Sequence, residues 1–170
     1  MKTYAYILSC LLILVLGTPC EYPVVNVPRE ARQSNWGGGS CVHATMVSLF
    51  RWQGRNQMAD YWRRSYSGGE NLRGLVAKFE KHGVRYAYTS TADVSFLEWS
   101  CRTRRGCGVV VLGGSHMIAL VHLDNRWAAL LDNNSISTFI WVPREQFLAE
   151  WRASGGWAIT PVYSPAAPLP

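Results

Sequence analysis

The sequence predicts an α+β fold, with helices in the first part of the chain and an antiparallel sheet after them. Two patterns indicate this order. Apolar residues recur at helical spacing from about residue 41, and short apolar runs separated by turn residues dominate from about residue 107. The length of 170 residues is enough for one domain with its own core. A hydrophobic content of 48% beside 16% charged residues is ordinary for a globular protein.

Helical spacing of apolar residues defines the expected helices, and alternating or continuous apolar runs define the strands. Gly54 ends the first expected helix, and Asp93 is placed to cap the start of the fourth. The expected helices span 41–53, 56–65, 71–82 and 93–104, with a short fifth one running from Pro143 to about Trp151. The expected strands span 84–89, 107–112, 116–123, 126–131, 138–142 and 157–162.

The two ends of the chain differ from this domain, which we expect to span 21–163. Lys2 followed by an apolar run over 6–16 is typical of a secretory signal peptide, which we place at 1–20. The run is much shorter than the ~20 residues of a membrane span. We therefore expect a secreted, periplasmic or cell-envelope protein without stable membrane insertion; an N-terminally anchored protein is the alternative. The Pro-rich tail 164–170 should be extended and poorly ordered.

The net charge of +6, or +5 once Lys2 leaves with the signal, is spread over the chain. Basic residues are not interleaved with aromatic residues, and no nucleic-acid-binding motif is present, so we expect no nucleic-acid partner. Weak attraction to anionic surfaces is the alternative use of this charge.

Counting the cysteines singles out Cys41. Of the five cysteines, Cys10 leaves with the signal and Cys20 could leave with it. Cys101 and Cys107 are close enough in sequence to pair in an oxidising compartment. Cys41 then remains unpaired, which marks a candidate reactive thiol. No spacing of Cys and His suggests a zinc site, and no cofactor is indicated.

The surroundings of Cys41 fit a nucleophile. It is expected to begin a helix, where free N–H groups and the helix dipole stabilise a thiolate. Three glycines at 37–39 remove side chains from the approach to it. A buried, inert cysteine is the alternative, since free cysteines are common in cores.

Among the four histidines, His116 is the candidate base. It follows a Gly-Gly-Ser turn and opens a strand, and catalytic residues often lie at such junctions. His43 lies on the same helix as Cys41 but on another face. His82 ends a helix, where a cation is favourable, and His122 lies within an apolar strand.

A base needs an orienting group on its second ring nitrogen. The strands 116–123 and 126–131 should form a hairpin. A three-residue loop would place His116 opposite Asp132, and a two-residue loop at 124–125 would place it opposite Asn133. Without other context, residues 132–134 would be read as a plain polar turn.

Acyl transfer also needs hydrogen-bond donors for the oxyanion. The backbone N–H of Cys41 is one candidate. Asn35 lies six residues before Cys41 and Gln33 lies eight before it; either side-chain amide could supply the second donor.

These residues together resemble papain-like cysteine peptidases, and more closely the compact branch of bacteriocin-processing (double-glycine leader) peptidases. The separations are six residues from Asn35 to Cys41, 75 from Cys41 to His116 and sixteen from His116 to Asp132. The resemblance implies a papain-like fold, with the nucleophile helix packed on an antiparallel sheet. It implies Cys41 as nucleophile, His116 as base, Asp132 as orienter and Asn35 as oxyanion donor. The branch usually has Gln in place of Asn35 and often Pro in place of Asn133.

We therefore expect an exported cysteine peptidase that acts on a peptide or protein substrate without a metal or organic cofactor. Two alternatives use the same residues differently: an acyl transferase or cell-wall peptide hydrolase, and a catalytically weak binding module that keeps the fold. The sequence does not indicate an oligomeric state or a cleavage specificity.

Overall fold

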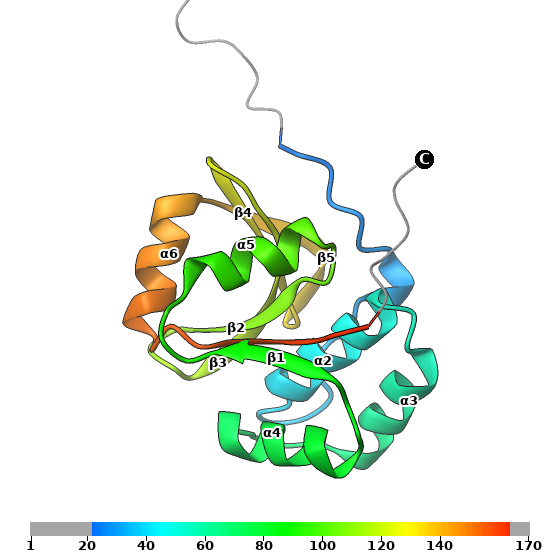
Figure 1. The fold of residues 1–170 in the computed structure, drawn as a ribbon. Helices are drawn as coiled ribbons and strands as arrows, with labels where there is room; N and C mark the ends of the chain where they lie inside the picture. The colour runs from blue at the N-terminus through cyan, green and yellow to red at the C-terminus, as the bar shows by residue number, and fades with distance from the viewer. Residues whose placement is uncertain (1–21, 164–170) are drawn as a thin grey trace, which may run out of the picture.

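The computed structural model describes residues 22–163 (Figure 1). The expected signal peptide and the Pro-rich tail lie outside these described residues, as do Cys10 and Cys20. Within 22–163, no helix is long and apolar enough to cross a membrane.

The described part of the chain contains every helix and strand that the sequence predicts, with ends that differ by at most three residues. It also contains a short 3₁₀ helix, η1 (Arg29–Ala31). The α-helices are α2 (Cys41–Trp52), α3 (Asn56–Ser65), α4 (Leu72–Lys81), α5 (Val94–Arg102) and α6 (Arg144–Ala153). The strands are β1 (Tyr86–Thr89), β2 (Cys107–Val111), β3 (His116–Leu123), β4 (Trp127–Asp132), β5 (Ser135–Pro143) and β6 (Ala158–Pro161).

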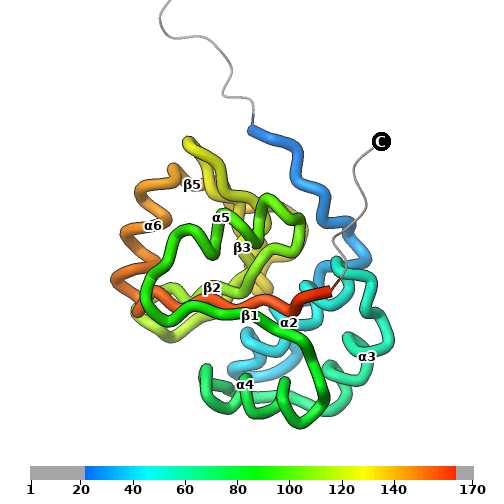
Figure 2. Tube along the Cα trace, in the orientation of Figure 1, coloured from blue at the N-terminus to red at the C-terminus, as the bar shows by residue number. Residues whose placement is uncertain are grey.

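The six strands form one antiparallel sheet in the order β1-β6-β2-β3-β4-β5. The strands β2 to β5 follow one another as hairpins, which is the expected antiparallel region. The last strand, β6, returns to lie between β1 and β2, and the two Cα traces of β6 and β1 run side by side in Figure 2. The α+β fold predicted from the sequence is therefore confirmed.

Each face of the sheet has its own apolar core, and successive side chains of β3 point alternately into the two cores. Met117 and Ala119 face the core under α2, α3 and α4, where Trp62 and Phe50 are fully buried. Ile118 and its neighbours on the same side of the sheet face the core under α5 and α6. Figure 1 shows α2 to α4 gathered on one side of the molecule and α6 away from them. His116, which begins β3, therefore lies at the end of a strand that is buried on both faces.

The hairpin of β3 and β4 differs from both registers expected from the sequence. The Asp124 N–H donates to the Trp127 carbonyl (3.0 Å), so the loop tip is residues 125–126. Leu123 pairs with Ala128, but Leu120 pairs with Leu130, because a bulge between Leu120 and His122 shifts the register by one residue.

This bulge decides what His116 can contact. If the shifted register is continued to the start of β3, His116 lies opposite residue 134. Asp132, two residues before that position, is then the diagonal neighbour of His116 on the same face of the sheet. Without the bulge, Asp132 would point to the opposite face. The prediction that His116 lies directly opposite Asp132 or Asn133 is wrong, yet the bulge restores the His116–Asp132 contact.

The possible Cys101–Cys107 disulfide is not formed, and both thiols are free. Cys107 lies in β2 within the core under α5, where the Ser100 hydroxyl donates a hydrogen bond to its sulfur (3.2 Å). Burial raises the pKa of the Cys107 thiol to about 12, so this sulfur stays protonated and unreactive.

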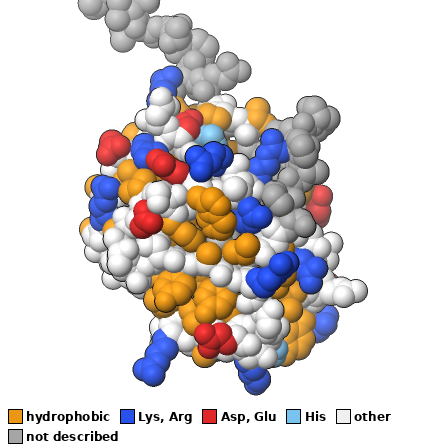
Figure 3. Space-filling model, viewed as in Figure 1, with side chains coloured by type: hydrophobic (Ala, Val, Ile, Leu, Met, Phe, Trp, Pro, Cys, Tyr) orange, Lys and Arg blue, Asp and Glu red, His pale blue; other side chains and the backbone are white. Residues whose placement is uncertain are grey.

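The basic side chains do not gather into one patch on the face drawn in Figure 3, where they are spread among acidic and apolar ones. Many contact aromatic rings instead: Arg32 lies over Phe139, and Arg105 lies over Trp99.

Candidate functional site

Cys41 is presented by a tight glycine turn at the start of α2. Gly39 has a φ of +79°, and a Cβ there would come within 3.0 Å of the Gly69 backbone nitrogen, so only glycine fits without strain. Ser40 is fully buried; its hydroxyl accepts a hydrogen bond from the Trp36 N–H (3.0 Å) and lies 3.2 Å from the Gly37 carbonyl. The Ser40 side chain holds the turn and does not cap α2. The first N–H groups of the helix therefore remain available to an anion.

The Cys41 thiol is half-buried and has a lowered pKa. Burial by itself raises the pKa of Cys41. This is outweighed by a hydrogen bond from the His116 side chain, by the N–H groups of Met117 and Val42, and by the positive charge of His116, so the pKa falls below the ordinary 9.0. The environment favours the thiolate form.

His116 lies between Cys41 and Asp132. Its Nε2 is 2.9 Å from Asp132 Oδ1, which leaves Nδ1 to face Cys41. The same carboxylate oxygen accepts the Asn134 N–H (2.9 Å), which fixes its orientation. The hydrogen bond with Cys41 raises the pKa of His116, burial lowers it and Asp132 raises it again, to about 8. The three side chains can hold a thiolate–imidazolium pair at neutral pH.

A cleft of about 340 Å³ opens beside Cys41 and His116. The turn around Gly39 and the segment 69–72 form one wall, and the β2–β3 turn with Met117 and Trp157 forms the other. Glu70 lies in this wall with its carboxylate largely buried, paired with Lys78 and packed over Gly74, where a Cβ would collide with it. Cys41 and His116 both line this cleft, so a substrate bound in it would reach the sulfur and the imidazole together.

Asn133 ties the helix that carries Cys41 to the strand that carries His116. Its Nδ2 lies 3.2 Å from the Cys41 carbonyl, 3.1 Å from Thr45 Oγ1 and 2.7 Å from the Met117 carbonyl. The side chain is buried, and its Oδ1 has no partner among residues 22–163. The sequence suggested Asn133 only as an alternative partner of His116, and the three polar residues 132–134 after an apolar strand were the available signal.

We expect Asn133→Ala to lower both stability and activity, because two buried carbonyls lose their donor. The free energy of unfolding should fall by about 1–3 kcal/mol, measured by chemical denaturation, and Cys41 and His116 should lose their alignment. Asn133→Asp should behave alike, since a carboxylate has no donor to offer these carbonyls. Asn125→Ala, which removes an exposed asparagine of the β3–β4 turn, is the control, with little change in stability or activity; equal losses in both variants would contradict this role.

The two candidate oxyanion donors occupy different places. Asn35 Nδ2 donates to Asn134 Oδ1 (2.6 Å), and the Asn35 Oδ1 accepts from Ser40 (3.3 Å), so Asn35 lies next to the residues that hold Asp132. Gln33 is buried against the second half of α2, where its N–H donates to Ser48 Oγ (2.9 Å) and its Oε1 accepts from Arg51 (3.0 Å). The structure therefore brings Asn35, and not Gln33, into the network around His116 and Asp132.

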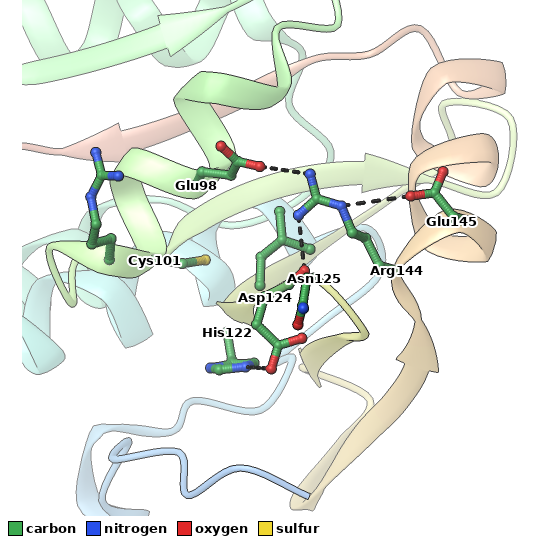
Figure 4. Close-up of a pocket in the computed structure, with 9 residues that line it drawn as sticks. Glu98, Cys101, His122, Asp124, Asn125, Arg144 and Glu145 are labelled. Atoms are coloured by element: carbon green, nitrogen blue, oxygen red, sulfur yellow. Dashed lines mark hydrogen bonds and ion pairs between the residues drawn. The ribbon is translucent and has the colours of Figure 1, made fainter.

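A second combination of cysteine, histidine and carboxylate lines another cavity, of about 620 Å³ (Figure 4). There His122 Nε2 is 3.0 Å from Asp124 Oδ2, and Arg144 lies between Glu98 and Glu145. Burial raises the pKa of the Cys101 thiol well above its ordinary value, with the nearby Cys107 adding to the shift. The opposite shifts of Cys101 and Cys41 favour the Cys41 site as the reactive one.

The remaining histidines and possible metal ligands show no comparable arrangement. His43 is buried and accepts a hydrogen bond from Trp62 (3.2 Å), as a core histidine does. His82 lies against Tyr66 and Tyr61. Within the part of the chain that the structure describes, no group of three or more His, Cys, Asp or Glu side chains could hold a metal ion.

No protein-family model matches the chain, and no curated protein matches it. Solved structures do. A protein from Bacillus anthracis described as a C39-like peptidase superposes with a TM-score of 0.62 at 13% identity, covering 85% of this chain and all of the other. The peptidase domain of Streptococcus ComA, a bifunctional ABC transporter in a quorum-sensing pathway, gives 0.57 at 19% identity, covering 78% of this chain and 99% of the domain.

A double-glycine-motif protease from an AMS/PCAT transporter, solved with its leader peptide, gives a TM-score of 0.51 at 14% identity, covering 72% of this chain and 84% of that one. These likenesses, at low identity, concern the path of the backbone. The chain has the fold of C39-like, papain-like cysteine peptidases.

Proposed function

We propose that the protein is an exported cysteine peptidase in which Cys41, His116 and Asp132 act as a triad. The observation that carries the proposal is the placement of His116, which lies 2.9 Å from Asp132 Oδ1 and lines the same cleft as Cys41; the lowered pKa of Cys41 and the raised pKa of His116 agree with it. The fold shared with peptidases supports it, and a leader peptide bound to one structural neighbour is consistent with a peptide substrate. The exported location rests on the sequence of residues 1–20.

The chemistry begins with the Cys41 thiolate, which attacks the carbonyl carbon of the substrate to give a tetrahedral oxyanion. The N–H groups at the start of α2, with the Asn35 amide as second donor, stabilise that charge. As the C–N bond breaks, the His116 imidazolium gives its Nδ1 proton to the departing amine and leaves a thioester on Cys41. Neutral His116 then takes a proton from water, the resulting hydroxide adds to the thioester, and the C–S bond breaks to restore the thiolate.

The runner-up function is acyl transfer, in which an amine in place of water takes the acyl group from Cys41. A binding module without activity is the other alternative. The lowered pKa of Cys41 favours an enzyme over a binding module, because binding alone has no need for a reactive thiolate.

The proposal is tested with a peptide library incubated with the protein before and after brief iodoacetamide treatment. We expect cleavage before treatment, loss of cleavage after it, and a single added carboxamidomethyl group on Cys41 by peptide mapping. Transfer products formed with an added amine, without hydrolysis, would favour the acyl transferase. Cleavage that persists with Cys41 fully modified would contradict the proposal.

A further inference from the structure

A second cavity, of about 220 Å³, borders the His116–Asp132 pair without including Cys41. It lies on the sheet face opposite Met117, because its floor is Ile118 and Leu130, which share a face with His116 and Asp132. Phe147 of α6 closes one side. His116 thus lines both this cavity and the cleft that holds the Cys41 thiol. The two hollows therefore share the imidazole of His116 as a lining group.

The rim of this cavity carries two exposed apolar side chains. Leu112 is 64% exposed and Ile140 is 42% exposed. Single exposed apolar residues are common on protein surfaces. Here, however, two of them flank one hollow whose floor is also apolar, and that combination is typical of a binding site.

The backbone at Leu112 also adopts a strained conformation. Its φ is +55°, a left-handed conformation that a leucine rarely adopts. The conformation is fixed by α6: Glu150 Oε1 accepts the Leu112 N–H (2.8 Å), and Ser154 Oγ accepts the Gly113 N–H (3.0 Å). A glycine or asparagine would adopt this turn with less strain, so the turn alone does not explain a leucine.

The chemistry at Cys41 and His116 indicates which part of the substrate would enter this cavity. After attack, the acyl half of the substrate stays on Cys41, whereas the amine half leaves past the imidazole that protonates it. A hollow lined by His116 and Asp132 but not by Cys41 lies on the amine side. Asp132 and Glu150 on its walls disfavour an acidic side chain there.

Resting on the proposed peptidase function, we propose that this cavity is a specificity pocket for the leaving side of the substrate. It binds one apolar side chain, of the size of Leu, Ile, Val or Phe, at one of the first two residues after the scissile bond. Its volume is below that of pockets that hold a whole small ligand, in keeping with a single side chain.

The test is cleavage of a peptide library with both products sequenced, followed by kcat/KM for matched peptides that differ only in this residue. The double variant Leu112→Asn, Ile140→Thr removes the apolar rim; asparagine tolerates the left-handed backbone and threonine suits a strand. Tyr88→Thr, another exposed apolar residue (50%) on the distant edge strand β1, is the matched control.

We expect apolar residues to be enriched on the leaving side, with kcat/KM about tenfold higher than for alanine or glutamate there. In the double variant this ratio should fall to near one, while cleavage of the alanine peptide and alkylation of Cys41 stay unchanged. Cleavage that needs Cys41 but shows no such preference, or a preference that survives the double substitution, overturns the pocket alone. Absence of any Cys41-dependent cleavage overturns the peptidase function and the pocket together.

Discussion

Replacing Cys41 with serine should reduce peptide cleavage by at least about 10⁴-fold while leaving the fold intact. Serine occupies nearly the same volume at the start of α2, so the turn held by Ser40 and Gly39 is kept. Its hydroxyl, however, does not ionise at the pH where the Cys41 thiol does, and His116 is arranged to stabilise an anion on sulfur. The measurement is the initial rate on a peptide that the wild-type protein cleaves, with circular dichroism to check folding.

Cys101→Ala is the control for this substitution, because it removes the other cysteine that lies near a histidine–carboxylate pair. The Cys101 thiol has a raised pKa and lines the 620 Å³ cavity beside His122 and Asp124, so its loss should leave cleavage unchanged. Equal activity in the wild-type and Cys41→Ser proteins would show that the thiol takes no part in the reaction.

Replacing His116 with alanine should lower peptide cleavage by about 10³-fold, since general acid–base catalysis of this kind contributes ~10² to 10⁴. Two functions are lost: stabilisation of the thiolate and protonation of the leaving amine. The two functions can be distinguished by changing the substrate and the pH. At pH values high enough to ionise an unassisted thiol, acylation by an activated ester should recover, because its leaving group needs no proton, whereas peptide cleavage should not.

His122→Ala is a matched control for His116→Ala, because His122 also pairs with a carboxylate at 3.0 Å but has no reactive thiol beside it. Its loss should leave both ester acylation and peptide cleavage near wild-type rates. A His122→Ala protein as inactive as His116→Ala would mean that the losses come from the fold.

Sequence reasoning could predict those parts of the site that depend on local structure. Cys41 begins a helix because a glycine turn precedes it, and His116 begins a strand because a Gly-Gly-Ser turn precedes it. Both residues sit at the ends of elements whose apolar pattern is clear. The fold class follows from the same pattern, since long helical runs come before hairpin-forming strands.

The parts that depend on strand register and on distant contacts could not be predicted. The bulge after Leu120 has no signature in composition, yet it decides which face of the sheet Asp132 occupies. Asn133 reads as a turn residue, and only the tertiary structure shows its amide against the carbonyls of Cys41 and Met117. Cys101 and Cys107 are near in sequence, but Cys107 lies in a buried strand and is a free thiol.

The rate of Cys41 alkylation by iodoacetamide as a function of pH tests the thiolate–imidazolium pair most directly. The lowered pKa of Cys41 predicts that alkylation becomes fast below pH 9.0, the ordinary pKa of a thiol. Because the pKa of His116 is raised to about 8, its proton is present below that pH and lost above it. Peptide cleavage should therefore fall as the pH rises through about 8, while alkylation of the thiolate continues.

In His116→Ala the pH at which alkylation becomes fast should move up toward that of a simple thiol, and in His122→Ala it should stay where it is. Alkylation of wild-type Cys41 that begins only near pH 9, or a profile that His116→Ala leaves unchanged, would contradict the account of Cys41 as an activated nucleophile.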